Sequence, residues 1–146
     1  MYYRPHHAAL NAWAEAASNQ YGTCLLIDAH SFTSNPLPCD LNQNPLRPDI
    51  CIGTDPFHTP PELQLRLIEI FESFNYSVLL NEPYAGTLVP SAYGQKQSQV
   101  KSIMIEINLA LYMNETDGTR SENFETVKSH VAEALELLAK VQIRPV

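Results

Sequence analysis

The chain has 146 residues, of which 45% are hydrophobic and 17% charged, which is typical of one globular domain with a sizeable core. Its formal net charge is −7 and it has no cluster of Lys and Arg, which argues against binding to nucleic-acid phosphates. No apolar run is long enough to span a bilayer, no signal-peptide pattern opens the sequence, and the three cysteines form no CxxC pair. We expect one cytoplasmic domain, residues 1–146, without nucleic-acid or membrane partners.

The first half of the chain predicts the order helix, strand, strand, helix. Residues 5–20 are rich in Ala and carry a Pro at their start, as helices often do. The run 23–28 is apolar without polar alternation, which predicts a strand covered on both faces. A long Pro-containing loop follows, and 49–53 predicts a short strand. The next helix is expected to begin at Pro60, with the Thr59 side chain as its N-cap.

The second half predicts two further strands and a long helix. The runs 76–81 and 102–108 are apolar and typical of strands, and a second loop with Pro and Gly separates them. After Ser121, apolar residues recur at helical spacing. Because helices or long crossovers separate the strands, we expect an α/β fold of three layers, with a mostly parallel, mixed sheet and flanking helices.

Polar side chains stand at the carboxyl end of each predicted strand. In open α/β sheets, functional sites form beyond these ends, so four of them together favour a shared site. The residues are Asp28, His30 and Ser31 at the first strand, Thr54, Asp55 and His58 after the second, Asn81 and Glu82 after the third, and Glu106 and Asn108 in the fourth.

Glu106 is the most informative of these residues. It lies within the run Ile-Met-Ile-Glu-Ile, where an ionised carboxylate must be paired, bound to a metal or shifted in its pKa. Glu106 is therefore a candidate general base, and a buried structural ion pair is the alternative. For Asp28 the alternative is a hydrogen bond that caps a turn, and for His30 it is an ordinary surface position.

These groups suit metal-assisted hydrolysis. The neutral imidazole of His30 is a good ligand for a divalent metal, and the Asp28 carboxylate is placed to orient it. A bound metal lowers the pKa of water toward ~7 and polarises a carbonyl group. Glu106 would then accept the proton of that water and pass it to the leaving nitrogen.

Several segments, in order along the chain, resemble the N-formylglutamate amidohydrolase (deformylase) family. The resemblance runs from about residue 3 to residue 115. It implies zinc-dependent hydrolysis of N-formyl-L-glutamate to formate and glutamate, late in histidine degradation. It also implies a fold similar to that of zinc carboxypeptidases and aspartoacylase. The segments that carry it are YYRPHHAAL at the start, then IDAHSF, RPDICIGTD, NEPYAGTLVPSAYG and SIMIEINLALYMNE.

The resemblance also implies roles for single residues. His30, which follows a strand in a D-x-H setting, corresponds to the third metal ligand, and Glu106 corresponds to the general base. Arg4 and Arg47 are candidates for binding a substrate carboxylate, and an ordinary surface position is the alternative for both. Six further residues are expected around the site. Asp28 and Glu82 are expected to contact the ligand residues and orient them. The residues expected to bind an N-acyl amino acid substrate are Arg4, Arg47, Asn81 and Asn108.

The chain departs from the family in two ways. Relatives carry an N-terminal segment with a first strand and the other two metal ligands, so this chain is expected to be the C-terminal part of a longer metallohydrolase domain, with an incomplete sheet. His30 alone does not make a zinc site; His58 and Glu82 are candidates to substitute for the absent ligands, although nothing in the sequence requires it. Leu109 stands where the family commonly has Arg.

Two hypotheses about function follow. In the first, the chain is part of an amidohydrolase and is inactive or very weak by itself. In the second, it is an inert remnant that acts as a binding or assembly module. In either case an uncovered sheet edge would promote association, so we expect a homo-oligomer, unless the helix 5–20 folds over that edge and keeps the chain monomeric.

Overall fold

The computed structural model describes residues 2–94 and 99–141, which form one mixed sheet with helices around it. In this part of the chain no helix is long and apolar enough to cross a membrane. The helices are α1 (Tyr3–Tyr21), α2 (Pro61–Ser73) and α3 (Phe124–Ala139), with a short 3-10 helix η1 (Leu109–Leu111). The strands are β1 (Cys24–Phe32), β2 (Ile50–Gly53), β3 (Val78–Leu80) and β4 (Val100–Asn108).

The strand order in the sheet is β1-β4-β2-β3. β1 pairs with β4 and β2 pairs with β3 in parallel, whereas β2 and β4 run antiparallel. The longest strands, β1 and β4, are therefore parallel neighbours although more than sixty residues separate them along the chain. The expected α/β fold with a mostly parallel, mixed sheet and flanking helices is confirmed.

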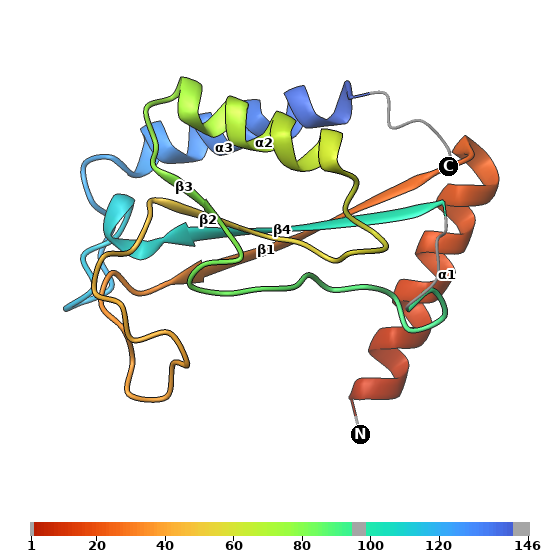
Figure 1. Ribbon diagram of the computed structural model, residues 1–146, viewed down its shortest axis with the longest axis horizontal. Coiled ribbons are helices and arrows are strands. Elements are labelled where there is room, and N and C mark those ends of the chain that lie inside the picture. Colours follow the sequence, from red (N-terminus) through yellow and green to blue (C-terminus); the bar gives the residue numbers. More distant parts are fainter. Residues whose placement is uncertain (1, 95–98, 142–146) are drawn as a thin grey trace.

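The two faces of the sheet are covered differently. Helices α2 and α3 lie side by side over one face (Figure 1). The opposite face is crossed by the extended segment 81–94, which forms hydrogen bonds with β1, β2 and β4. Helix α1 stands at the amino ends of β1 and β4, away from their arrowheads (Figure 1). The carboxyl ends of these two strands are thus free of helices on the loop-covered face.

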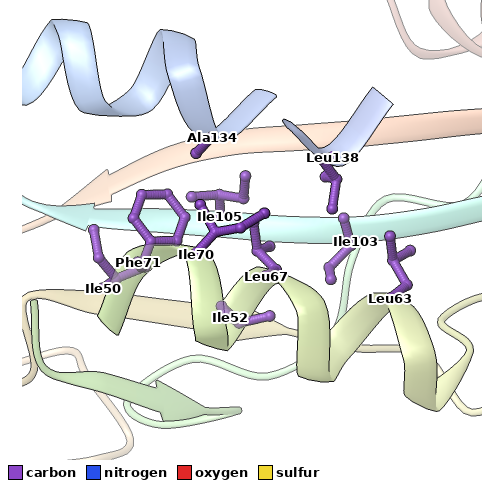
Figure 2. Close-up of a cluster of buried hydrophobic side chains, with 10 residues drawn as sticks. All are labelled: Ile50, Ile52, Leu63, Leu67, Ile70, Phe71, Ile103, Ile105, Ala134 and Leu138. Atoms are coloured by element: carbon purple, nitrogen blue, oxygen red, sulfur yellow. The ribbon is translucent and has the colours of Figure 1, made fainter. Parts of the chain in front are cut away.

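The hydrophobic core fills the space between the sheet and helices α2 and α3 (Figure 2). Helix α2 turns four apolar residues toward the sheet at helical spacing, because its sequence places them three or four positions apart. Burial of each such side chain contributes roughly 1.5–3 kcal/mol of transfer free energy. The core side chains are Ile50, Ile52, Leu63, Leu67, Ile70, Phe71, Ile103, Ile105, Ala134 and Leu138.

Two expectations about single elements are wrong. Thr59 does not cap α2: the N-cap is Pro60, and the Thr59 hydroxyl donates instead to the carbonyl oxygen of Ser102 at 2.6 Å. This bond ties the start of α2 to β4. The strand expected at 23–28 is covered only in part: Cys24–Asp28 are half-buried, residues 29–31 are exposed, and β1 lies at the edge of the sheet.

Candidate active site

His30 and Glu106 lie side by side near the carboxyl ends of β1 and β4. They are paired in the parallel register of these strands, so their side chains project from the same face of the sheet. Asp28 precedes His30 by two residues and shares this face, and its Oδ1 lies 2.8 Å from His30 Nε2. We call these three residues the Asp28–His30–Glu106 cluster. Their chemical roles stay predictions.

Asp28 is held from two sides. One carboxylate oxygen contacts His30, and the other accepts a hydrogen bond from the backbone N–H of Leu88 at 2.9 Å. When His30 Nε2 donates its proton to Asp28, the Nδ1 atom keeps a lone pair. The His30 side chain is 51% exposed, so this ring is accessible from solvent. The loop that contains Leu88 thereby sets the orientation of His30 through Asp28.

Glu106 is the buried acid of the cluster. The residue is 8% exposed, and its Oε2 atom has no hydrogen-bond partner among the residues that the structure describes. Burial raises the pKa of the Glu106 carboxyl, the neighbouring His30 opposes this shift, and the Asp28 charge adds to it. Desolvation is the largest of these effects. A carboxyl in this position exchanges its proton closer to neutral pH than an exposed one does.

Cys51 extends the cluster across the sheet. It is paired with Glu106 in the antiparallel register of β2 and β4, and it is fully buried. Its Sγ donates a hydrogen bond to the carbonyl oxygen of Tyr84 at 3.2 Å. Burial raises the pKa of the Cys51 thiol, and the charges of Glu106 and Glu82 add to the effect. Glu82, on the exposed turn after β3, is therefore within electrostatic reach of the same thiol.

Asn81 and Asn108 use their amide groups to hold turns. Asn81 accepts a hydrogen bond from the backbone N–H of Thr54 and donates one to the Thr54 hydroxyl. Asn108 donates to the carbonyl oxygen of Pro48 and accepts from the backbone N–H of Ala110. These contacts account for both residues without a substrate, and their expected substrate contacts stay predictions.

Arg47 is buried within the loop that follows β1. Its side chain is 1% exposed, forms an ion pair with Asp40 at 2.9 Å and donates a hydrogen bond to the Tyr84 hydroxyl at 3.1 Å. The guanidinium carbon also lies 5.9 Å from the Phe32 ring centroid. The backbone N–H of Leu37 holds the pKa of the Asp40 carboxyl below its usual range, and Tyr84 and Arg47 add to this effect. These contacts give Arg47 a structural role in holding the loop.

Two other candidates are far from the cluster. Arg4 is exposed in the first turn of α1. Helix α1 stands at the amino ends of β1 and β4, away from the cluster at their carboxyl ends (Figure 1). His58 is fully buried, and its Nδ1 atom lies 2.8 Å from the carbonyl oxygen of Val100 at the amino end of β4. The structure therefore does not bring His58 to the side of His30, where it would substitute for a metal ligand.

The cluster by itself does not fit a zinc ion. A zinc site needs three or four ligand atoms in tetrahedral array. Within residues 2–94 and 99–141, no group of three His, Cys, Asp or Glu side chains is arranged to hold a metal. His30 is the imidazole of the Asp28–His30–Glu106 cluster, and its Nε2 atom is engaged by Asp28.

The sequence reasoning missed the residues that support the cluster. Cys51 reads as an ordinary apolar position of a short strand, and nothing local indicates that it lies opposite Glu106. The contact of Leu88 with Asp28 joins positions sixty residues apart through a backbone N–H, which every residue type except proline carries. The buried pair of Tyr84 with Arg47 likewise depends on how two loops meet.

Comparison with known proteins connects this geometry to one family. The family model described as N-formylglutamate amidohydrolase matches residues 1–113. The chain is 32% identical to the N-formylglutamate deformylase of Pseudomonas putida over 117 residues, which are 79% of this chain and 43% of the relative. It is 29% identical to the Pseudomonas aeruginosa deformylase over 138 residues, which are 92% of this chain and 51% of the relative.

A solved structure gives the same answer. The crystal structure of N-formylglutamate amidohydrolase from Ralstonia eutropha JMP134 superposes with a TM-score of 0.81 and 28% identity, covering 96% of this chain and 52% of that one. The chain thus spans about half the length of the curated relatives that it matches. The likeness to zinc carboxypeptidases and aspartoacylase stays a prediction. The chain belongs to the N-formylglutamate amidohydrolase family.

Proposed function

We propose that this chain carries the hydrolytic carboxylate of an amidohydrolase that cleaves the formyl amide of N-formyl-L-glutamate. The products would be formate and L-glutamate, as in the last part of histidine degradation. Membership of the family supports the substrate, because its named members are N-formylglutamate deformylases or amidohydrolases. The chain spans about half of such relatives, so we assign the activity to an assembled protein and not to this chain alone.

One observation carries this proposal: Glu106 is a buried carboxylate beside a half-exposed histidine, and one of its oxygens has no hydrogen-bond partner in the described part of the chain. A carboxyl whose pKa is raised by burial is suited both to accept and to return a proton near neutral pH. In the proposed reaction, Glu106 accepts a proton from the water that attacks the formyl carbon. The carbon–nitrogen bond then breaks as this proton passes to the nitrogen of glutamate.

His30 and Asp28 would act beside Glu106. Asp28 fixes the imidazole, so that one ring nitrogen faces the carboxylate and the other is left for a ligand. Zinc is the ligand that the family resemblance favours, and a neutral imidazole suits it. Because the described residues supply no group of three ligands, we propose zinc binding only where His30 is joined by ligands from outside them.

The absence of such a ligand group among the described residues favours a second candidate function. In it, the chain keeps the fold of the family without hydrolysis and serves as a binding or assembly module. Leu109, which stands where the family commonly has Arg, agrees with a lost contact at the site. The two candidates differ in one respect that experiment can address, namely whether Glu106 supports turnover when the rest of a family member is present.

The test is a hybrid enzyme. Residues 1–113 of this chain replace the matching segment of the Pseudomonas putida deformylase, and release of formate from N-formyl-L-glutamate is measured. We expect turnover, and we expect Glu106→Gln to lower kcat by about 10²–10⁴-fold, the usual contribution of a general base. Glu62→Gln, which removes an exposed carboxylate at the start of α2, is the control. A folded but inactive hybrid would favour the inert module.

A further inference from the structure

Ser102 is a fully buried hydroxyl residue in an otherwise apolar part of a strand. β4 reads Val-Lys-Ser-Ile-Met-Ile-Glu-Ile-Asn, and Ser102 has no exposed surface. A buried hydroxyl group costs free energy unless it forms hydrogen bonds, so its partners explain why it is there. Because alternate residues of a strand share a face, Ser102 lies on the same, loop-covered face of the sheet as Glu106. The Ser102 hydroxyl is therefore on the side of the candidate active site.

The partners of this hydroxyl lie in the segment 81–94. Ser102 Oγ donates a hydrogen bond to the carbonyl oxygen of Leu88 at 2.7 Å. The Thr87 hydroxyl lies 2.8 Å from the same Oγ atom. A hydroxyl group has one proton to donate, so Thr87 is the donor of this second bond. One serine of β4 thus holds two successive residues of the segment.

Leu88 binds two different strands with its two backbone groups. Its carbonyl oxygen accepts the hydrogen bond from Ser102 of β4, and its N–H donates to Asp28 Oδ2 of β1 at 2.9 Å. Only two soft dihedral angles separate the N–H and the carbonyl group of one residue, so fixing one group restricts the other. The bond from Ser102 therefore helps to fix the N–H that Asp28 binds.

Asp28 extends this restraint to His30. While Oδ2 is bound to Leu88, Oδ1 lies 2.8 Å from His30 Nε2. The Asp28 side chain is 15% exposed, whereas that of His30 is 51% exposed. Packing selects the rotamer of a half-exposed ring less strongly than that of a buried one. The hydrogen bond to Asp28 is thus an important restraint on the His30 ring.

We propose that Ser102 is a positioning residue for His30 in the candidate active site. Its hydroxyl fixes the backbone N–H of Leu88, and that N–H holds Asp28. Asp28 in turn orients the His30 ring beside Glu106. The chemical use of this orientation rests on the proposed function, whereas the orientation itself rests on the hydrogen bonds.

The test compares the full, isotope-labelled chain with its Ser102→Ala variant by NMR. In the variant the Leu88 carbonyl group loses its side-chain donor, so we expect exchange of the Leu88 amide to become faster by about tenfold or more. The scalar couplings across the χ1 angle of His30 should change from the values of one staggered rotamer to averaged values. A loss of global stability alone would not average the rotamer of His30 in the folded chain.

Thr59→Val is the matched control. The Thr59 hydroxyl donates to the backbone carbonyl oxygen of Ser102 at 2.6 Å, so this variant loses a buried hydrogen bond at the same residue of β4 without removing a partner of Leu88. Exchange of Leu88 relative to that of the core amide of Ile105 should stay near the wild-type value, and the His30 couplings should not change.

A conservative variant guards against misfolding. Ser102→Cys keeps a weak donor of similar size, so its effects on Leu88 and His30 should lie between those of the wild type and of Ser102→Ala. Circular dichroism shows whether each variant is folded, and Ser102→Cys carries the same test if Ser102→Ala does not fold.

The hybrid enzyme with the Pseudomonas putida deformylase adds a kinetic readout. We expect Ser102→Ala to lower kcat for release of formate by about 10–100-fold, the usual effect of losing a group that orients a metal-binding residue, with little change in KM. Thr59→Val should leave kcat near the value of the unmodified hybrid.

Three results would overturn the proposal: wild-type Leu88 exchange and His30 couplings in Ser102→Ala, equal changes in Thr59→Val, or an active hybrid in which Ser102→Ala leaves kcat unchanged. A hybrid that releases no formate, although Ser102→Ala frees the His30 ring in the full chain, would contradict the proposed function and leave the positioning of His30 by Ser102 in place.

Discussion

Glu106 combines two properties that rarely occur together in a strand: it is buried, and one of its oxygens lacks a partner among the described residues. Its neighbours Ile105 and Ile107 are apolar, which is why the sequence alone already marks it. The structure adds the reason for its state, because burial raises the pKa of the carboxyl and the adjacent His30 offsets only part of that shift. The charged Glu106 carboxylate therefore lowers the free energy of unfolding.

That cost gives a pH-dependent prediction for Glu106→Gln. Because the folded-state pKa of Glu106 is raised, the stability associated with this carboxyl is present below its unfolded pKa and is lost as pH rises through the folded pKa. The uncharged Gln does not lose it. We expect the variant to gain stability over the wild type as pH rises from about 4 to about 8, measured by urea unfolding.

The control for this experiment is Glu133→Gln, which removes an exposed carboxylate of α3. The difference in the free energy of unfolding between this variant and the wild type should change little across the same pH range. If Glu106→Gln differs from the wild type by the same amount at every pH, the carboxyl is not held in the buried state described above.

At the level of elements, the contact between β2 and the segment 81–94 is tight. A Cβ atom placed on Gly53 would overlap the carbonyl oxygen of Gly86 and the side chain of Met104. We expect Gly53→Ala to destabilise the fold by about 1–3 kcal/mol, because a packed neighbour must move. Thermal unfolding measures this. Gly94→Ala, where an added Cβ meets nothing within 4 Å, is the control, and an equal loss in both variants would contradict the proposed contact.

The helices and strands could largely be predicted from the sequence, whereas the elements that lie next to each of them in space could not. Leu63 and Leu67 recur at helical spacing, and this local pattern is enough to identify α2. Nothing local states that β4 lies between β1 and β2, because pairing depends on contacts distant in sequence. The same limit explains why β1 was expected to be covered on both faces. Its composition is that of a buried strand, but among the described residues no strand pairs with its outer edge.

The candidate site could likewise be predicted from the sequence only in part. His30 and Glu106 stand at strand ends in the sequence, and parallel pairing brings them together. Cys51 lies opposite Glu106 in the sheet and donates a hydrogen bond to Tyr84, and both contacts join separate segments, so no spacing rule could identify them. Arg47 carries the positive charge expected of a residue that binds a substrate carboxylate. That it is buried in an ion pair with Asp40 could be seen only in the structure.

At the scale of the whole molecule, we expect the isolated chain to hydrolyse N-formyl-L-glutamate very weakly or not at all, with or without added zinc. The described residues hold no group of three metal-ligating side chains, and His30 alone cannot retain the ion. Release of formate is the measurement. Turnover comparable to that of a full-length deformylase, abolished by His30→Ala, would show that this chain is a complete enzyme.

We also expect the isolated chain to associate with itself. The edge of β1, which no described strand pairs with, and the apolar pocket lined by Ile107, Tyr112, Phe124, Val127, Lys128 and Val131 favour contacts between copies. Light scattering coupled to size exclusion should give a mass above the 16.4 kDa of the monomer that rises with concentration. Ala29→Lys should shift the chain toward the monomer. A wild-type monomer at high concentration would contradict this expectation.

The central claim is that Glu106 is a buried, proton-exchanging carboxyl beside His30. NMR titration of the ¹³C-labelled Glu106 carboxyl in this chain tests it most directly, in the wild type and in His30→Ala. We expect a pKa above the ordinary glutamate value in the wild type, because burial dominates, and a still higher pKa in His30→Ala, because the opposing effect of His30 is lost. An ordinary pKa that His30→Ala leaves unchanged would contradict it.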